Sequence, residues 1–307
     1  MSRYRNLWRF VALAALWGSA FAAIKAGLDY YPPVLFAALR YDLAAAVMLG
    51  YAALATDRAV PRGRREWAAV GVGAALMIAA YHAFLFVGEQ GTTSAAAAVV
   101  VSLSPVLTAG FARLLLPAER LSPLGVAGLL LGLLGVVAVA RPSSSALLAS
   151  DVLAELLVFA AALSFALGSV VTEWLDADLA IETMEAWSMV GGALALHVVS
   201  LALGESPTAV TLAGPGLIAL AYLSLGSSAA GFLLYFDLLE RLGSVEINLV
   251  SYAAPAFAAL TGFLFLDEVV DVWTVVGFCC ILVGFALIKR RALGREIPRL
   301  RAALGTE

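Results

Sequence analysis

The chain carries SPVLTAGFARLLLPAERLSPLGVAGLLLGLLG at residues 104–135 and APAFAALTGFLFLDEVVDVWTVVGFCCILVG at residues 254–284, and the two stretches share one pattern. Each holds a proline inside an apolar run, then a glutamate in a short polar break, then a pair of glycines. The residues are Pro105, Glu119, Gly128 and Gly135 in the first stretch and Pro255, Glu268, Gly277 and Gly284 in the second. A pattern that occurs twice with matching spacing predicts a duplicated unit.

The composition places this unit in a membrane. The chain is 63% hydrophobic and 13% charged, with a mean hydropathy of +0.96, whereas a soluble domain carries about 25% charged residues. A helix needs about 20 apolar residues to cross the hydrocarbon core. The sequence therefore predicts an all-α integral membrane protein with ten transmembrane helices. They cover 10–28, 34–54, 67–87, 95–116, 124–140, 152–171, 184–203, 216–239, 245–266 and 272–288.

The positions of Lys and Arg predict the orientation of these spans. With a cytoplasmic N-terminus, most of the 19 Lys and Arg residues fall in cytoplasmic segments, and Arg141 falls in an outer loop. The loop 172–183 is acidic although it should be cytoplasmic, but acidic residues count little in this rule. Both termini are therefore predicted to be cytoplasmic.

Five spans per unit is an odd number, so the second unit must enter the membrane with the opposite orientation. The sequence predicts two inverted five-helix repeats, 1–145 and 146–292, followed by a cytoplasmic tail, 293–307. Inverted repeats of this kind are common in secondary transporters, where they place a substrate site near the bilayer midplane.

Other classes of protein are not favoured by the sequence. Cys279 and Cys280 are adjacent within the last span, where they are expected to pack rather than to form a disulfide or bind a metal. The first apolar run is longer than the apolar region of a cleaved signal peptide. The chain has no phosphate-binding loop of an ATPase and no His-Glu-x-x-His motif. We therefore expect no enzyme activity, no cofactor and no nucleic-acid partner.

Motifs along both halves resemble the EamA-type transporters of the drug/metabolite transporter superfamily. In the first half they are Leu16-Trp17-Gly18-Ser19-Ala20-Phe21 with Lys25, Leu39-Arg40-Tyr41, Gly91-Thr92-Thr93-Ser94-Ala95, Ser104-Pro105 and Ala118-Glu119-Arg120-Leu121. In the second half they are Leu239-Glu240-Arg241-Leu242-Gly243, Ser251-Tyr252-Ala253-Ala254-Pro255 and Asp267-Glu268. One departure is that the usual Gly-Glu after the proline helix is Ala118-Glu119 here and Asp267-Glu268 in the second half.

The resemblance implies a ten-helix secondary carrier that works by alternating access, commonly an exporter of amino acids or other small metabolites. It also implies a small-molecule substrate and a lipid bilayer around the protein, with a coupling proton or ion and a homodimer as further options. A prokaryotic plasma membrane fits the predicted cytoplasmic termini. The alternatives are a carrier of sugars, nucleotide sugars or phosphorylated metabolites and, less favoured, an integral-membrane enzyme or a membrane sensor.

Charged residues inside spans are candidates for the substrate site, because a charge in hydrocarbon tends to face a cavity or a partner. Lys25 lies about 5 Å and Arg40 about 9 Å below the outer ends of their spans. Lys25 either snorkels to the interface or lines a cavity on a stripe with Trp17 and Phe21. Arg40 either pairs with Asp42 or Glu89, binds an anionic or carboxylate-bearing substrate, or snorkels.

Two further titratable residues lie in the outer half of the first repeat. His82 is either a satisfied packing residue or a carrier of a coupled proton. Glu89 is either an interfacial loop charge or a contact for a proton or substrate. His197 and Glu155 are analogues in the second half, and Trp17 and Tyr81 are expected to supply an aromatic wall.

Pro105 and Pro255 remove backbone donors at matching positions, so they are either helix hinges near a transport site or ordinary kinks. Polar residues just before them are expected to face the cavity: Ser102, Ser104, Asn248, Ser251 and Tyr252. The candidate substrate residues are thus Trp17, Lys25, Arg40, Tyr81, His82, Asn248, Ser251 and Tyr252, with His82 and Glu89 as candidate proton carriers.

Two sets of residues are assigned structural roles. Glu119 and Glu268 are expected to cap the helices that follow them. The glycines of spans five and ten are expected to pack helices closely, with contacts between two protomers as an option.

Overall fold

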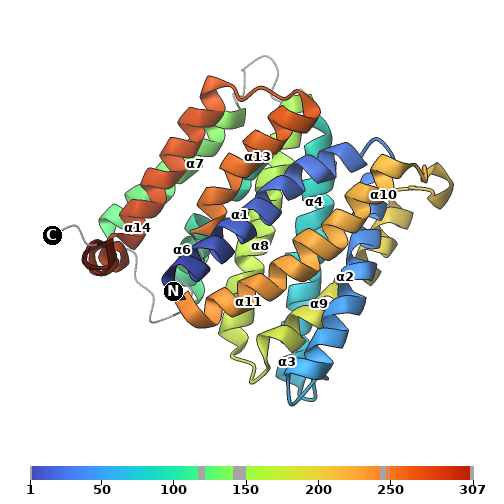
Figure 1. The fold of residues 1–307 in the computed structure, drawn as a ribbon, viewed down its shortest axis with the longest axis horizontal. Helices are drawn as coiled ribbons and strands as arrows, with labels where there is room; N and C mark the ends of the chain where they lie inside the picture. Colours follow the sequence, from blue (N-terminus) through green and yellow to red (C-terminus); the bar gives the residue numbers. More distant parts are fainter. Residues whose placement is uncertain (1, 117–121, 141–149, 243–246, 248, 305–307) are drawn as a thin grey trace.

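The computed structural model describes residues 2–116, 122–140, 150–242, 247 and 249–304, and the described residues form helices and turns with no strand. Figure 1 shows these helices as one bundle. The first half contains α1 (Ser2–Gly27), α2 (Pro33–Ala55), α3 (Arg64–Val72), η1 (Gly73–Ala80), α4 (Tyr81–Gly88), η2 (Glu89–Gly91), α5 (Ser94–Val101), α6 (Ser104–Leu115) and α7 (Pro123–Ala140). The second half contains α8 (Ser150–Leu175), α9 (Ile181–Ala202), η3 (Pro207–Ala209), α10 (Gly214–Ala221), η4 (Tyr222–Ala230), α11 (Gly231–Leu242), α13 (Val250–Leu266) and α14 (Val272–Leu304).

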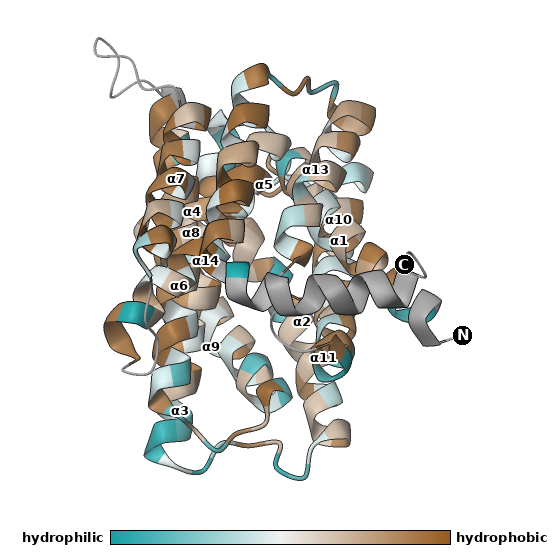
Figure 2. Ribbon diagram, turned by 90° about the vertical axis from the view of Figure 1, so that its left-hand side faces the viewer, coloured by the Kyte–Doolittle hydropathy of each residue, from teal (hydrophilic) through white to brown (hydrophobic). Residues whose placement is uncertain are grey.

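Within the residues that the structure describes, seven helical stretches are long and apolar enough to cross a membrane, and three shorter apolar helices accompany them. The seven are Arg5–Gly27, Pro33–Ala55, Arg64–Gly91, Ser94–Leu115, Val152–Leu175, Ile181–Ala202 and Gly214–Leu242, and the shorter helices are Pro123–Val139, Val250–Leu266 and Val272–Ile288. Hydrophobic residues cover the sides of the bundle, while hydrophilic residues gather at the end near α3 (Figure 2). Every predicted span coincides with one of these ten stretches, and the count of ten crossings stays a prediction.

The helices of the two halves pack in matching pairs. α1 packs on α13 as α8 packs on α6, and α2 packs on η4 as α9 packs on η1. α8 packs on α4 as α1 packs on α11. The pairs α2 with α9, α5 with α13, and α7 with α14 each join equivalent helices of the two halves. The boundary predicted at residue 145 lies outside the described residues.

Two π-helices interrupt the third and eighth predicted spans at matching places. η1 joins α3 to α4, and η4 joins α10 to α11. A π-turn bonds i to i+5, so it leaves a backbone group of the ordinary helical ladder free, and such turns are frequent at functional sites. Ser164 of α8 donates to the Leu76 carbonyl of η1 (2.8 Å), and Trp17 of α1 donates to the Ser227 carbonyl of η4 (3.2 Å). The opening helix of each half thus donates a side-chain hydrogen bond to a backbone carbonyl in the π-helix of the other half.

α7 and α14 lie side by side at one side of the bundle (Figure 1), and their glycines allow the two helices to touch. A Cβ on Gly128 would lie 2.5 Å from the Gly284 carbonyl oxygen, and a Cβ on Gly135 would lie 2.7 Å from the Gly277 carbonyl oxygen. Both distances are too short for any side chain. The predicted packing role of these glycines is confirmed within one chain, and the homodimer stays a prediction.

The two prolines sit in different helical surroundings. Pro105 lies in the first turn of α6, after a break at Ser102 and Leu103 that separates α6 from α5. Pro255 lies inside α13, which begins at Val250. A break in the proline helix of the first half is therefore observed, while the predicted hinge role of both prolines stays a prediction. In the last helix, α14 continues to Leu304 and so includes most of the stretch predicted as a tail.

Candidate functional site

Arg40 is a buried cation in the bundle interior. Its side chain projects from α2, and the residue is 6% exposed. Nε donates to the Ser228 hydroxyl (2.9 Å) and Nη2 to the Ser227 hydroxyl (3.4 Å), both on η4. Asp42 binds His197 instead (2.8 Å), and no carboxylate among the described residues forms an ion pair with Arg40. A guanidinium has five N–H donors, so serine hydroxyls alone leave it able to bind an anion.

Trp17 reaches the same π-helix from α1. Its indole Nε1 donates to the Ser227 carbonyl, and its ring lies against Tyr235 (5.5 Å between ring centroids) and Phe232 (5.9 Å). A Cβ on Gly231 would lie 2.7 Å from Trp17 Nε1, so the glycine at the start of α11 leaves the space that the indole needs. Trp17, one of the two residues of the predicted aromatic wall, thus lies beside η4, next to the serines that bind Arg40. Its role in a substrate site stays a prediction.

His82 and Tyr41 form a buried hydrogen-bonded pair. The His82 Nδ1 donates to the Ile78 carbonyl (2.8 Å), and the Tyr41 hydroxyl bonds Nε2 (2.9 Å). Because a carbonyl only accepts, Nδ1 carries the hydrogen and a neutral imidazole accepts from Tyr41 at Nε2. Tyr81 packs its ring against His82 (4.5 Å) and Phe165 (5.5 Å). Both His82 nitrogens are occupied, which favours the packing interpretation over a proton carrier.

Lys25 ties α1 to the turn between α4 and α5. Its Nζ donates to the backbone carbonyls of Glu89 (2.8 Å) and Thr92 (2.6 Å). The ammonium therefore serves as a cap for a helix end, where carbonyls lack partners within the helix. Neither snorkelling nor a free cavity cation, the two sequence-based options, describes this arrangement.

Glu89, at the start of η2, is completely buried. The residue is 0% exposed, and neither carboxyl oxygen has a hydrogen-bond partner in the part of the chain that the structure describes. Lys25, Glu268 and Arg40 lie within electrostatic reach of the carboxyl group. The interpretation of Glu89 as an interfacial loop charge is wrong, because an interfacial carboxylate would be hydrated.

Glu268 caps a helix of the other half. Its carboxylate accepts from the Ser94 backbone N–H with both oxygens (3.1 and 3.0 Å), at the first residue of α5. Asp271 caps α14 by accepting from Trp273 and Thr274 N–H groups (2.7 and 3.1 Å). The prediction that Glu268 caps the helix that follows it is therefore wrong. The equivalent prediction for Glu119 lies outside the described residues.

The remaining candidate residues of the second half make contacts with other residues than Arg40 does. Tyr252 is 8% exposed and packs its ring on Phe285 of α14 (4.5 Å between ring centroids). Ser251, its neighbour on α13, is half-buried. Asn248 lies outside the described residues. The structure thus gathers Trp17, Arg40, Tyr81 and His82 around α2, α4 and η4, and places Tyr252 against α14.

Several interior polar residues were missed by sequence reasoning. Ser227 and Ser228 bind Arg40, and a serine pair after Gly226 within an apolar span was the available signal. Glu185 of α9 is 6% exposed and lies within electrostatic reach of Tyr41 and Tyr235. Its signal was a carboxylate four residues into an apolar helix.

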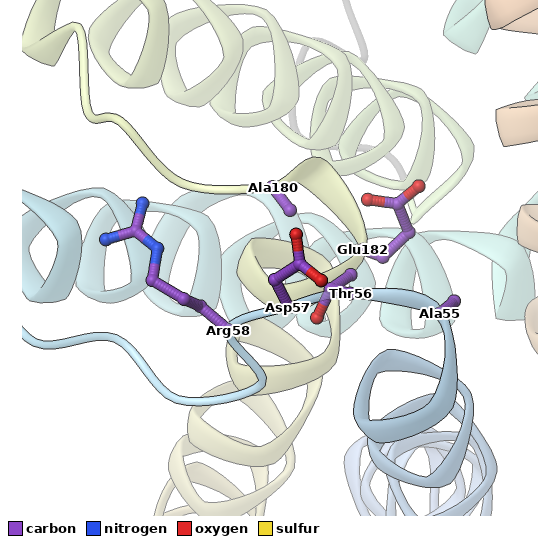
Figure 3. Close-up of a pocket in the computed structure, with 6 residues that line it drawn as sticks. All are labelled: Ala55, Thr56, Asp57, Arg58, Ala180 and Glu182. Atoms are coloured by element: carbon purple, nitrogen blue, oxygen red, sulfur yellow. The ribbon is translucent and has the colours of Figure 1, made fainter.

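A surface hollow of about 320 Å³ lies elsewhere, at the end of α2 (Figure 3). It is lined by Ala55, Thr56, Asp57, Arg58, Ala180 and Glu182. Arg40 precedes Ala55 by fifteen residues of α2, about 22 Å along the helix axis. Arg58 also pairs with Glu66 (3.2 Å) and Asp178 (3.3 Å). The hollow therefore belongs to the loops at one end of the bundle and not to the buried polar cluster.

Apolar helices that enclose a buried polar cluster define a multi-pass membrane protein. The model of the EamA-like transporter family matches residues 7–141 and again residues 152–290. The chain belongs to this family. The expected resemblance is thereby confirmed, and the two matches cover the two stretches that carry the repeated pattern.

Two of the similar proteins described next are named as a transporter and a probable exporter, and the third is named as a WAT1-related protein. The chain is 27% identical over 283 residues to a chloroplastic WAT1-related protein of Arabidopsis thaliana, covering 89% of this chain and 66% of that protein. It is 27% identical to the uncharacterized inner membrane transporter YedA of Escherichia coli K12, covering 82% of this chain and 79% of that protein. It is also 27% identical to a probable terminal-alkyne amino-acid exporter of Streptantibioticus cattleyicolor, covering 96% and 97%.

A solved crystal structure has the same fold. It matches with a TM-score of 0.65 and 24% identity, and the match covers 96% of this chain and 99% of that chain. At this identity the likeness concerns the fold alone.

Proposed function

We propose that the protein is a secondary carrier that exports small carboxylate-bearing metabolites, amino acids among them, across a plasma membrane without chemically changing them. Arg40 is the residue that binds the substrate carboxylate. The observation that carries this proposal is a buried guanidinium held by two serine hydroxyls, with no acidic partner among the described residues. A buried cation is costly unless an anion is paired with it, so a carboxylate from the substrate completes the site.

The geometry around Arg40 favours a single negative charge. Lys25 is engaged with two carbonyl oxygens, so among the described residues near this level Arg40 is the cation that remains for a ligand. Guanidinium and carboxylate groups match in bidentate geometry. This favours a monocarboxylate over a phosphorylated metabolite or a nucleotide sugar, which carry more charge.

The aromatic residues beside the serines suit the rest of such a substrate. Trp17, Phe232 and Tyr235 form a continuous aromatic contact next to η4. Aromatic faces supply large apolar area in ligand sites, where few polar groups set the orientation. The name of the Streptantibioticus relative, a probable amino-acid exporter, supports the direction and the substrate class.

Alternating access is proposed to follow from two inverted repeats, 1–145 and 146–292, with ten membrane crossings and both termini in the cytoplasm. The matching helix pairs of the two halves support this arrangement. The cluster of Arg40 and η4 lies between helices of both halves, since α2 precedes residue 145 and η4 follows it. Rocking of one half against the other would open the cluster to each side in turn.

The test is transport of a labelled amino-acid panel in proteoliposomes that contain the purified protein. We expect saturable counterflow of at least one amino acid, and Arg40→Gln should abolish it while membrane insertion remains. Arg113→Gln is the matched control, because Arg113 is exposed at the end of α6. Normal counterflow by Arg40→Gln would remove Arg40 from the site, and no flux of any panel member by the inserted protein would contradict the substrate class.

A further inference from the structure

We infer that Glu89 is the proton-binding group of the carrier, protonated in the arrangement seen here and deprotonated when the turn around η2 opens. The inference starts from two facts about this residue. Its side chain is 0% exposed, and both carboxyl oxygens lack a hydrogen-bond partner among the residues that the structure describes. An ionised carboxylate is costly in such a place, because neither water nor a donor compensates for its lost hydration.

The position of Lys25 supports a neutral Glu89. The ammonium is close enough to donate to the backbone carbonyl of Glu89 itself (2.8 Å) and to that of Thr92 (2.6 Å). It forms no ion pair with the Glu89 carboxyl oxygens, which have no partner in the described residues. An ionised carboxylate would attract an ammonium this near, since opposite charges interact strongly where water is excluded. The observed choice of carbonyl acceptors therefore fits a protonated carboxyl group.

Neighbouring acids are already engaged, which distinguishes Glu89 from them. Glu155 of α8 accepts a hydrogen bond from the Thr92 hydroxyl. Glu268 accepts from the Ser94 backbone N–H with both oxygens. The charged and titratable groups within electrostatic reach of Glu89 include Lys25 from α1, Glu268 from the turn before α14, Arg40 from α2 and Tyr81 from α4. α8, which carries Glu155, packs on η2 as well.

The location of Glu89 links its protonation to movement of the turn around η2. It lies in η2, between α4 and α5, and Lys25 holds this turn to α1 through two carbonyls. When Glu89 loses its proton, its carboxylate competes with those carbonyls for the ammonium. Lys25 then moves to the carboxylate and the tie between α1 and the turn is released. The proton leaves the Glu89 carboxyl oxygen for water on the side to which the turn has opened, and no other bond is made or broken.

The first test does not depend on transport. A hydrophobic carbodiimide reacts with protonated carboxyl groups inside a membrane protein, so dicyclohexylcarbodiimide is applied to the full-length protein in liposomes over a series from acidic to alkaline pH. Peptide mass spectrometry should find an adduct on Glu89 that decreases about tenfold per pH unit above the titration midpoint. Glu240, exposed at the end of α11, is the control carboxyl and should stay unlabelled. No adduct on Glu89 at any pH, or labelling independent of pH, would overturn the inference.

The second test rests on the proposed function and uses the amino acid retained from the panel. Glu89→Gln imitates the protonated carboxyl group, so we expect counterflow at equal pH to persist while acceleration by an imposed pH gradient is lost. Glu240→Gln should keep both activities. Gradient-driven flux at the normal rate in Glu89→Gln would overturn the inference. If no panel member is transported, the labelling experiment still decides the state of Glu89, so failure of the substrate proposal and failure of this inference are distinguishable.

Discussion

Trp17 and Arg40 hydrogen-bond to one residue, Ser227, from two sides. The indole of Trp17 donates to the Ser227 carbonyl, and the guanidinium of Arg40 donates to its hydroxyl. Ser227 lies within η4, so both hydrogen bonds are made to the π-helix. The first two helices of the chain thus both bind one residue of the eighth predicted span. The position of Arg40, the candidate ligand-binding residue, and the position of Trp17 therefore depend on each other.

Ser228 is predicted to position Arg40 for its ligand. A hydrogen bond to a charged group contributes about 1.5–3 kcal/mol, and the Nε bond to Ser228 is the shorter of the two serine contacts (2.9 against 3.4 Å). Ser228→Ala should raise the KM for the transported amino acid about tenfold, with a smaller change in the maximal rate. Counterflow kinetics in proteoliposomes measure both quantities.

The matched control is Ser224→Ala. Ser224 lies on the same π-helix and is buried, but its hydroxyl donates to the Leu220 carbonyl of its own helix (2.7 Å). We expect an unchanged KM in this variant. Equal effects of the two substitutions would mean that a general disturbance of η4, and not the contact with Arg40, alters the kinetics.

The membrane helices were predictable because length and hydropathy define them physically. Every predicted span overlaps a helical stretch of the structure. The break before α6 follows from the missing backbone N–H of Pro105. The π-helices were not predictable, since one extra residue per turn leaves no signal in an apolar run. Glu185 was missed because the predicted span began at Met184, whereas α9 begins at Ile181, which moves the carboxylate about 4.5 Å further into the helix.

The partners of charged residues were the least predictable part of the site. Sequence reasoning paired charges with neighbours in the chain or with opposite charges, as for Arg40 with Asp42 and Glu268 with the helix after it. The structure pairs Lys25 with backbone carbonyls and Glu268 with a backbone N–H 174 residues away. Helix ends offer such groups throughout the fold, and which end lies near which side chain is decided by tertiary packing.

Gly231 is predicted to be required for the position of Trp17. A Cβ at this residue would lie 2.7 Å from the indole Nε1, and overpacking of this kind costs about 1–3 kcal/mol. Gly231→Ala should lower the melting temperature and weaken binding of the transported amino acid. Thermal unfolding in detergent, followed with and without that amino acid, measures both effects.

Gly50→Ala is the control for this substitution. Gly50 lies within α2, and a Cβ there meets no atom within 4 Å. Because Ala is favoured over Gly in a helix by about 0.5–1 kcal/mol, this variant should unfold at the same or a higher temperature. A melting temperature of Gly231→Ala as high as that of Gly50→Ala would show that the indole can move without cost.

Glu268 is predicted to stabilise the contact between the two halves. Its carboxylate accepts from the first residue of α5, and loss of an N-terminal cap costs about 1 kcal/mol. Glu268→Ala should therefore lower the melting temperature. Asp267→Gly should not lower it, because Asp267 has a φ of 53°, which glycine adopts more readily. Equal loss in both variants would point to disruption of the turn itself.

The loops of the structure lead to a final prediction about orientation. Glu205, after α9, accepts from the backbone N–H groups of Val34 and Leu35 at the start of α2 (3.0 and 2.7 Å), so these two segments lie at one end of the bundle. Arg58, after α2, pairs with Asp178, before α9 (3.3 Å), at the other end. This grouping agrees with a topology in which the segment around Glu205 is external and the segment around Arg58 is cytoplasmic.

A fluorescent protein fused after Leu304 should therefore fluoresce in the cytoplasm. Alkaline phosphatase should be active when fused after Thr208 and inactive when fused after Leu304. Phosphatase activity after Leu304 would reject the even number of crossings, and with it the inverted arrangement of the two halves.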